Sequence, residues 1–196
     1  MKKHAIVLAA MFGATAAQAA PPAGAAQGPF YITAAAGPAH LSVDCSGTTS
    51  CDTSGTGGKL VFGYSFGNGF SLEGSYINFG KTHAGIAAIA GTPAGTITLK
   101  PSALVFGGAY ALPLGSDWGM AVRLGVAQVK TRTKFSFGTQ IGDAAESETR
   151  PVAGLAVSYA LNSSVKLELG VDASEAQMSG QKGSVRLVSL GATFSF

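Results

Sequence analysis

Large apolar side chains alternate with small or polar ones along most of this chain. In segments of about ten residues, every second position holds a large apolar side chain, and the positions between hold mainly Gly, Ala, Ser or Thr. A period of two is typical of β-strands whose two faces meet different surroundings. The pattern predicts eight strands, of which the first alternates most weakly: about residues 30–39, 59–66, 70–76, 103–112, 118–127, 154–161, 165–172 and 188–196.

The predicted connections between strands alternate between short and long. Three short ones are rich in turn-forming residues: Gly67–Gly69, Pro113–Asp117 and Asn162–Ser164. Four longer and less regular ones are predicted at Leu41–Gly57, Lys81–Thr96, Thr131–Arg150 and Met178–Gly183.

Composition separates this chain from water-soluble domains. It has 28 glycines among 196 residues, 46% hydrophobic residues and only 12% charged ones, whereas about a quarter of an ordinary domain is charged. A disordered chain would be richer in charge, and the 13 basic residues do not cluster as nucleic-acid binding requires. The most apolar run, residues 84–97, is interrupted by glycines and a proline and is too short for a membrane helix.

A closed β-barrel is the remaining way to satisfy backbone hydrogen bonds in lipid. The large apolar face is expected to point to lipid, because the second face is too poor in charge to form a wetted exterior, as in a soluble carrier barrel. Gly, Ala, Ser and Thr suit the inside of an eight-stranded barrel, which side chains can fill. We therefore predict an all-β protein, an eight-stranded antiparallel up-and-down transmembrane β-barrel.

The N-terminus reads as an export signal. Lys2 and Lys3 precede a short apolar stretch, and Ala17-Gln18-Ala19 is a small-residue cleavage site. We expect a signal peptide at residues 1–19, a short periplasmic segment at 20–29 and the barrel domain at 30–196. Without the two lysines, 11 basic residues (13 minus 2) face 10 acidic ones, so the exported protein is nearly neutral.

Two stretches carry a family resemblance. Residues 58–80, with the turn Gly67-Asn68-Gly69, resemble the second hairpin of small OmpA-like and OmpX/Ail-like outer-membrane barrels. The ending Leu190 to Phe196 resembles the terminal signature of outer-membrane barrels, in which Phe194 and Phe196 would belong to the signal that the barrel-assembly machinery reads. The resemblance implies residence in the cell outer membrane, with lipid and lipopolysaccharide as surroundings. In such barrels the short turns face the periplasm and the long loops face outward. With an even number of strands, both termini are then expected in the periplasm.

The only two cysteines, Cys45 and Cys51, lie in the first long connection of an exported chain. A disulfide is the expected state in an oxidising compartment. It would close a loop of about seven residues, worth about 2.4 kcal/mol on the loop-entropy model. Two cysteines without a nearby pair of histidines are too few ligands for structural zinc.

Several charged residues have the parity of the lumen-facing side. Glu73, Arg123 and Glu168 lie three to five residues above periplasmic turns, with Lys166 just beneath, and a second level pairs Lys59 with Asp172. An isolated buried charge is costly, so these groups are expected to pair and to plug the lumen with ionic contacts.

The leading functional expectation is a structural or surface-exposed barrel without an open pore, acting in envelope integrity or in adhesion through its loops. A loop ligand is not identified; no enzyme activity, catalytic residue, metal, cofactor or nucleic-acid partner is expected. One alternative is a lipid-modifying enzyme: His40 and Ser42 are two residues apart, and this His-x-Ser is similar to that of lipid A deacylases, where it lies in a later strand. A narrow channel is the other.

Overall fold

The computed structural model describes residues 28–42, 50–86, 94–137, 140–178 and 181–196. These residues form strands throughout: β1 (Phe30–Ser42), β2 (Ser50–Asp52), β3 (Ser54–Ser65), β4 (Phe70–Asn78), β5 (Thr82–Ile86), β6 (Gly95–Pro113), β7 (Trp118–Phe137), β8 (Gln140–Ala160), β9 (Val165–Met178) and β10 (Gln181–Ser195). No helix in this part of the chain has the length and apolar character that a membrane crossing requires.

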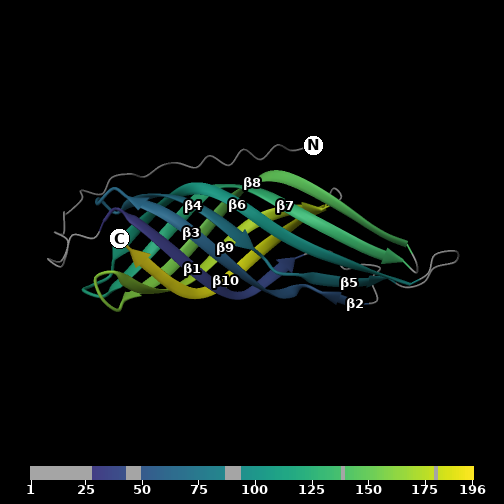
Figure 1. Ribbon diagram of the computed structural model, residues 1–196, viewed down its shortest axis with the longest axis horizontal. Coiled ribbons are helices and arrows are strands. Elements are labelled where there is room, and N and C mark those ends of the chain that lie inside the picture. The colour runs from purple at the N-terminus through teal and green to yellow at the C-terminus, as the bar shows by residue number, and fades with distance from the viewer. Residues whose placement is uncertain (1–27, 43–49, 87–93, 138–139, 179–180) are drawn as a thin grey trace, which may run out of the picture.

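Within the described residues, eight of these strands close into one antiparallel barrel (Figure 1). The neighbours around the ring run β6, β4, β3, β1, β10, β9, β8 and β7, and the pairing of β6 with β7 closes it. The first and last strands meet along their length, with Tyr31 opposite Ser195 and Ser42 opposite Ser184. The short strand β5 pairs with the first residues of β6, beyond the end of β4, and β2 pairs with β5. The predicted fold class is thus confirmed.

The three short turns lie where the sequence predicts them, and local chemistry explains the first and the third. In the first, Phe66 N–H donates to the Phe70 carbonyl at 2.9 Å. Gly67 and Gly69 there adopt φ values of +79° and +89°, which side chains disfavour. In the third, the Asn162 side-chain oxygen accepts from the backbone N–H groups of Ser164 and Val165, each at 2.9 Å.

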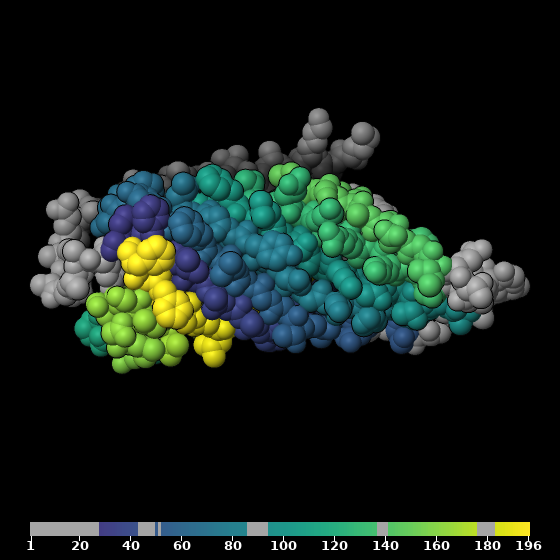
Figure 2. Space-filling model, in the orientation of Figure 1, coloured from purple at the N-terminus to yellow at the C-terminus, as the bar shows by residue number. Residues whose placement is uncertain are grey.

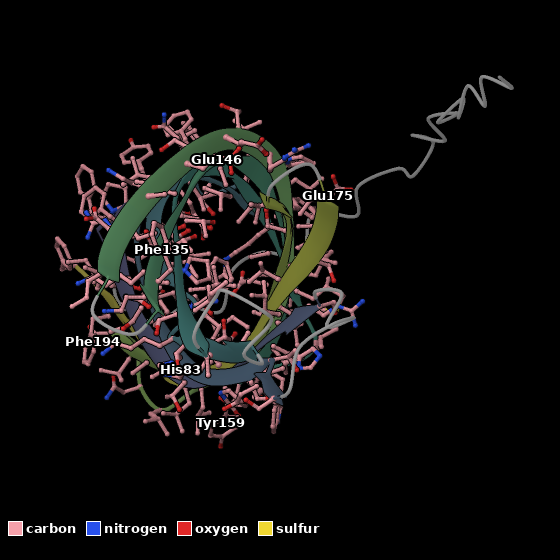
Figure 3. All side chains as sticks on the ribbon, turned by 90° about the vertical axis from the view of Figure 1, so that its right-hand side faces the viewer. His83, Phe135, Glu146, Tyr159, Glu175 and Phe194 are labelled. Atoms are coloured by element: carbon pink, nitrogen blue, oxygen red, sulfur yellow. The ribbon has the colours of Figure 1, made fainter. Side chains whose placement is uncertain are left out.

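The outer face of the barrel is apolar over its middle and aromatic near the short turns. The large side chains of the alternating pattern are exposed, with Leu104, Leu124 and Leu190 each about two-thirds accessible, as a lipid-facing surface requires. Figure 3 looks along the barrel and shows Tyr159 and Phe194 on the outside of the ring. Exposed aromatic residues gather near the short turns: Phe30, Tyr64, Phe66, Phe70, Tyr110, Trp118, Tyr159 and Phe196.

Two of the predicted long connections are largely strand. Residues 131–137 continue β7 and residues 140–150 begin β8, and the two pair from Thr131 opposite Glu146 to Phe137 opposite Gln140. The predicted connection at Met178–Gly183 is likewise mostly taken up by β9 and β10. The sequence reading missed these extensions because strands that rise out of the membrane have no lipid-facing apolar row.

The wall of the barrel opens where β8 leaves β9. Their last pair is Val152 with Ser174, and the next residue of β8 is Pro151, which has no N–H to continue the ladder. The Ser174 hydroxyl donates to the Pro151 carbonyl at 3.1 Å and so occupies the acceptor at this end. Beyond it, residues 140–150 of β8 pair with β7 alone. The β7–β8 hairpin therefore projects past the barrel at the right of Figure 1, with the outer part of β6 still paired to β7 as far as Gly95 opposite Phe137.

Candidate functional site

The inward-facing charged side chains come from β3, β4, β7 and β9, on different sides of the ring. Because side chains alternate along each strand, Lys59, Glu73, Arg123, Glu168 and Asp172 all point into the lumen. All but Arg123 are buried, and the Arg123 side chain is only 12% exposed. We call these five residues the ionic layer.

Arg123 joins the two sides of the ionic layer. Its guanidinium Nη1 and Nη2 donate to the two oxygens of Glu168 at 3.1 and 2.8 Å, in a bidentate arrangement. Its Nε donates to both oxygens of Glu73, at 3.2 and 3.0 Å. One cation therefore binds carboxylates from β4 and β9, which lie two strands from β7 on either side of it in the ring.

Lys59 connects the two predicted levels of charge. Its ammonium lies 2.8 Å from Asp172 Oδ2 and 3.4 Å from Glu168 Oε1, and its side chain is 1% exposed. Glycine makes room for it, since a Cβ on Gly170 would lie 3.1 Å from the ammonium nitrogen. The layer thus contains two cations and three carboxylates in one continuous network.

Tyr31 belongs to this network and was missed by the sequence reading. Its hydroxyl donates to Glu73 Oε1 at 2.6 Å, and its ring lies directly against Gly63, in the space that a Cβ there would occupy. The first strand alternates weakly, so its inward residues did not stand out. The sequence does hold one sign of this contact: Tyr31 is an aromatic residue at inward parity, and Gly63 lies opposite it in the next strand.

Lys166 stands outside the network. It is half-buried, and in the described part of the chain it makes no ion pair with these carboxylates. It lies two residues closer than Glu168 to the turn that ends at Ser164. The oxygens of Glu168 are already taken by Arg123 and Lys59, so the expected contact with Lys166 is not formed.

A second layer, apolar and unexpected, fills the lumen further from the short turns. Leu41, Ile77, Phe79 and Leu187 are each at most 3% exposed and meet inside the barrel. The remaining buried members are small or branched: Ala39, Ala103, Ala127, Val129, Val152 and Val185. The inner face is therefore not uniformly small and polar, which corrects the expectation from the sequence. We call these residues the apolar layer.

The two residues of the enzymatic alternative lie on the outer side of β1. His40 and Ser42 are exposed on either side of the buried Leu41. The His40 ring nitrogen Nδ1 contacts the Ser54 hydroxyl at 3.5 Å, and no hydrogen bond joins His40 to Ser42 within the described residues. A nucleophile needs its base within hydrogen-bond reach, so the geometry offers nothing in favour of hydrolysis here.

Three further sequence predictions concern the ends and the first loop. The signal peptide and the segment up to residue 27 lie outside the described residues, and so do Cys45 and the side chain of Cys51. The signal peptide and the disulfide between the two cysteines therefore remain predictions. Phe194 and Phe196 are exposed on the outer face. Phe196 N–H donates to the Phe30 carbonyl at 3.0 Å and its ring faces that of Phe30, across the seam between first and last strands.

Comparison with known proteins agrees with this architecture. The family model described as outer membrane protein beta-barrel domain matches residues 5–196. The chain belongs to this family. The resemblance stated from the sequence is thereby confirmed, and the chain is an outer-membrane β-barrel protein.

Solved structures with the same fold share little sequence with this chain. Ail, the attachment invasion locus protein of Yersinia pestis, superposes with a TM-score of 0.54 at 16% identity, over 85% of this chain and 99% of Ail. Neisserial surface protein A gives 0.51 at 16% identity, over 88% of this chain and all of its own. No curated protein sequence matches the chain. At such identities the likeness shows a shared fold and nothing more.

Proposed function

We propose that this protein is a closed outer-membrane barrel that presents the β7–β8 hairpin at the cell surface as an adhesive or scaffolding element, without conducting solutes. In this proposal the short turns and both termini face the periplasm, and the hairpin faces outward. Outer-membrane lipid and lipopolysaccharide surround the barrel. The terminal strand with Phe194 and Phe196 would be recognised by the barrel-assembly machinery.

The filled lumen supports a closed barrel. An eight-stranded barrel has an interior just wide enough for side chains to fill. Here, charged side chains meet across it at hydrogen-bonding distance in the ionic layer, and bulky apolar side chains meet in the apolar layer. An ion would have to break buried salt bridges and then enter an apolar region, and both steps are costly.

The projecting hairpin supports a role at the surface. It carries the most exposed large apolar side chain of the described residues, Ile141, at 82% accessible. On the other face of the hairpin, the Phe135 ring lies against Gly142 and is 36% exposed. Both side chains are held on paired strands, clear of the apolar band, where another molecule can reach them.

The fold itself is compatible with ligand binding. Ail, at 16% identity, has been solved in complex with the heparin analogue sucrose octasulfate. That complex concerns Ail, and the identity of any ligand for the present hairpin remains to be measured.

The proposal is tested by shortening the hairpin above Arg132. Arg132 and Ala145 are paired in the ladder, so replacing residues 133–144 by Asn-Gly joins them through a two-residue turn. Cells with equal amounts of folded barrel are compared for adhesion to immobilised glycans and matrix proteins. The proposal predicts that cells with the shortened barrel adhere less than cells with the wild type, while their envelope resists detergent equally well.

A matched pair of variants separates the effect of the hairpin from a general effect of losing an exposed apolar side chain. Ile141→Ser removes an apolar side chain from the hairpin, and Leu114→Ser removes one of similar size, 57% exposed, from a short turn. Only the first is expected to reduce adhesion. Equal adhesion by wild type, Ile141→Ser and the shortened barrel would refute the adhesive role. Cleavage of the hairpin by protease only after permeabilisation would refute the orientation.

A further inference from the structure

The outer wall of the barrel has a hollow at the height where the strands leave the apolar band. After Asn78, opposite Ser102, the sheet resumes with Thr82 opposite Leu99. Three residues on this side therefore face only two on β6, which makes a bulge. Pro101, with no N–H to donate, lies opposite it, and Phe79 N–H donates to the Pro101 carbonyl at 3.1 Å.

Local chemistry holds the bulge in one shape. The Asn78 side-chain oxygen accepts from Gly80 N–H at 2.8 Å. Gly80 has a φ of +82°, and a Cβ there would lie 2.5 Å from the Thr56 carbonyl oxygen, so only glycine fits. Phe79 turns into the lumen as part of the apolar layer. The wall thereby recedes and leaves an open hollow of about 530 Å³ on the outside.

Three cationic side chains line this hollow. They are Lys81 beside the bulge, Lys100 on β6 and its cross-strand neighbour Arg132 on β7. In the described part of the chain none of the three forms an ion pair with a carboxylate, unlike the cations in the lumen. Asn78, Ser102 and Tyr76 supply further polar groups. Such a set of donors suits an anion with several oxygens, and phosphate above all.

An apolar groove of about 580 Å³ adjoins the hollow and shares Gly58, Tyr76 and Asn78 with it. Its floor is made of small residues, Ala34, Ala36 and Gly58, between the larger side chains of Leu60 and Leu190. β3 runs toward a short turn, so the groove at residues 58–60 lies nearer the membrane centre than the hollow at residues 56–58. Figure 2 shows this face, with β1 in purple and β3 in blue.

We propose that the hollow and groove together bind a phosphorylated, multiply acylated glycolipid of the outer leaflet, of the lipid A type. Its phosphate would lie among Lys81, Lys100 and Arg132, and a saturated acyl chain would lie in the groove over Ala36. The cations lie beyond the exposed Leu104 of β6 and Val126 of β7, on the side of the apolar band that faces away from the short turns. The leaflet rests on the orientation proposed above; the site itself does not.

A lipid accounts for the pair of features better than a soluble anion. The groove opens on the face that carries the lipid-exposed side chains Leu60 and Leu190. A free phosphate would use the hollow alone, and an ordinary phospholipid presents one phosphodiester rather than a sugar-bound phosphate monoester. The two parts of the site can therefore be tested separately.

The experiment measures binding to the purified, refolded full-length barrel in phosphatidylcholine nanodiscs, by native mass spectrometry. The probes are lipid A with its phosphates, the same lipid with its phosphates removed, phosphatidylglycerol, and inorganic phosphate as competitor. Lys100→Gln/Arg132→Gln removes two cations from the hollow. The matched control, Lys130→Gln/Lys134→Gln, removes two exposed cations from the same face of β7 that do not line it.

We expect the hollow variant to weaken lipid A binding by about tenfold to thirtyfold, because each basic side chain near an anionic lipid surface contributes about fivefold. The control should change it much less, since Lys130 and Lys134 do not line the hollow and would not contact the bound phosphate. The wild type should bind dephosphorylated lipid A as weakly as the hollow variant does. Excess inorganic phosphate should not displace the lipid.

A second pair of variants tests the groove. Ala36→Phe fills it, and Ala153→Phe makes the same change on exposed β8, on another part of the wall. Only Ala36→Phe should weaken lipid A binding. Folding of every variant is checked by the mobility shift between unboiled and boiled samples.

Several results would overturn the proposal. Equal losses in both double variants would mean a general charge effect, and equal affinity for phosphatidylglycerol would mean that any anionic lipid suffices. Displacement by inorganic phosphate, or identical binding by Ala36→Phe and wild type, would remove the acyl part of the site. None of these outcomes affects the adhesive role of the hairpin, which is measured on cells with residues 133–144 replaced and Arg132 retained.

Discussion

Replacing Arg123 by alanine tests the ionic layer most sharply, because Arg123 alone binds carboxylates on both sides of the lumen. The change removes four hydrogen bonds, two to Glu73 and two to Glu168. Glu73 keeps the hydroxyl of Tyr31, and Glu168 keeps Lys59 at 3.4 Å. Two buried carboxylates are thus left with one partner each.

The loss of these partners lowers the free energy of unfolding. Removing one partner of a buried ion pair typically destabilises a protein by about 3–5 kcal/mol. The remaining partners, and water entering the vacated space, place Arg123→Ala at the lower end, about 3 kcal/mol. With a urea dependence of about 2 kcal/mol per molar, the unfolding midpoint should fall by about 1.5 M.

The assay is urea unfolding in lipid vesicles. The folded fraction at each urea concentration is measured from the heat-modifiable gel band. Arg186→Ala is the control, because Arg186 is an exposed arginine on β10; its midpoint should match the wild type. Adding Glu73→Gln and Glu168→Gln to Arg123→Ala should recover at least half of the loss, since it removes the uncompensated charges. An unchanged midpoint for Arg123→Ala, or no recovery on neutralising the carboxylates, would refute the reasoning.

Three further expectations concern single positions. Gly63→Ala should cost about 1–3 kcal/mol, because its Cβ would occupy the tyrosine ring packed on that glycine; Gly74→Ala, with open space around it, should not, and equal urea midpoints would contradict this. Deleting Phe196 removes its contact across the barrel seam and should lower folded protein in the outer membrane, measured on unboiled gels at native expression; unchanged levels would refute its role in assembly. Thiol labelling without reductant should modify neither Cys45 nor Cys51, and labelling of both would exclude the disulfide.

The barrel could be predicted because lipid imposes a simple rule on sequence. In the membrane, each strand has one apolar and one inward face, so residues such as Leu104 and Leu124 mark strand, parity and outer surface together. Parity and distance from the turns were also enough to bring Glu73, Arg123 and Glu168 to one depth. Sequence could not specify which oxygens each cation reaches, because that depends on the stagger between strands.

The features that sequence analysis missed lie where the rule no longer applies. Residues 130–135 alternate basic and β-branched or aromatic side chains, which is also a strand pattern. Because these residues have no lipid-facing apolar row, the sequence analysis assigns them to a loop. Ile77 and Phe79 put large apolar side chains at inward parity, beside the polar Asn78 at outward parity. That reversal is the signature of the apolar layer. The hollow above it needs the bulge, whose only sequence signals are Gly80 and Pro101.

The conductance of the purified wild-type barrel in a planar lipid bilayer tests the central claim, a lumen closed by the ionic and apolar layers, most directly. A porin inserted in the same bilayer shows that channels are detected, and the heat-modifiable band shows that the added protein is folded. We expect no steady ion current above that of the bare bilayer. A reproducible, voltage-independent current from the folded wild type would contradict the closed lumen.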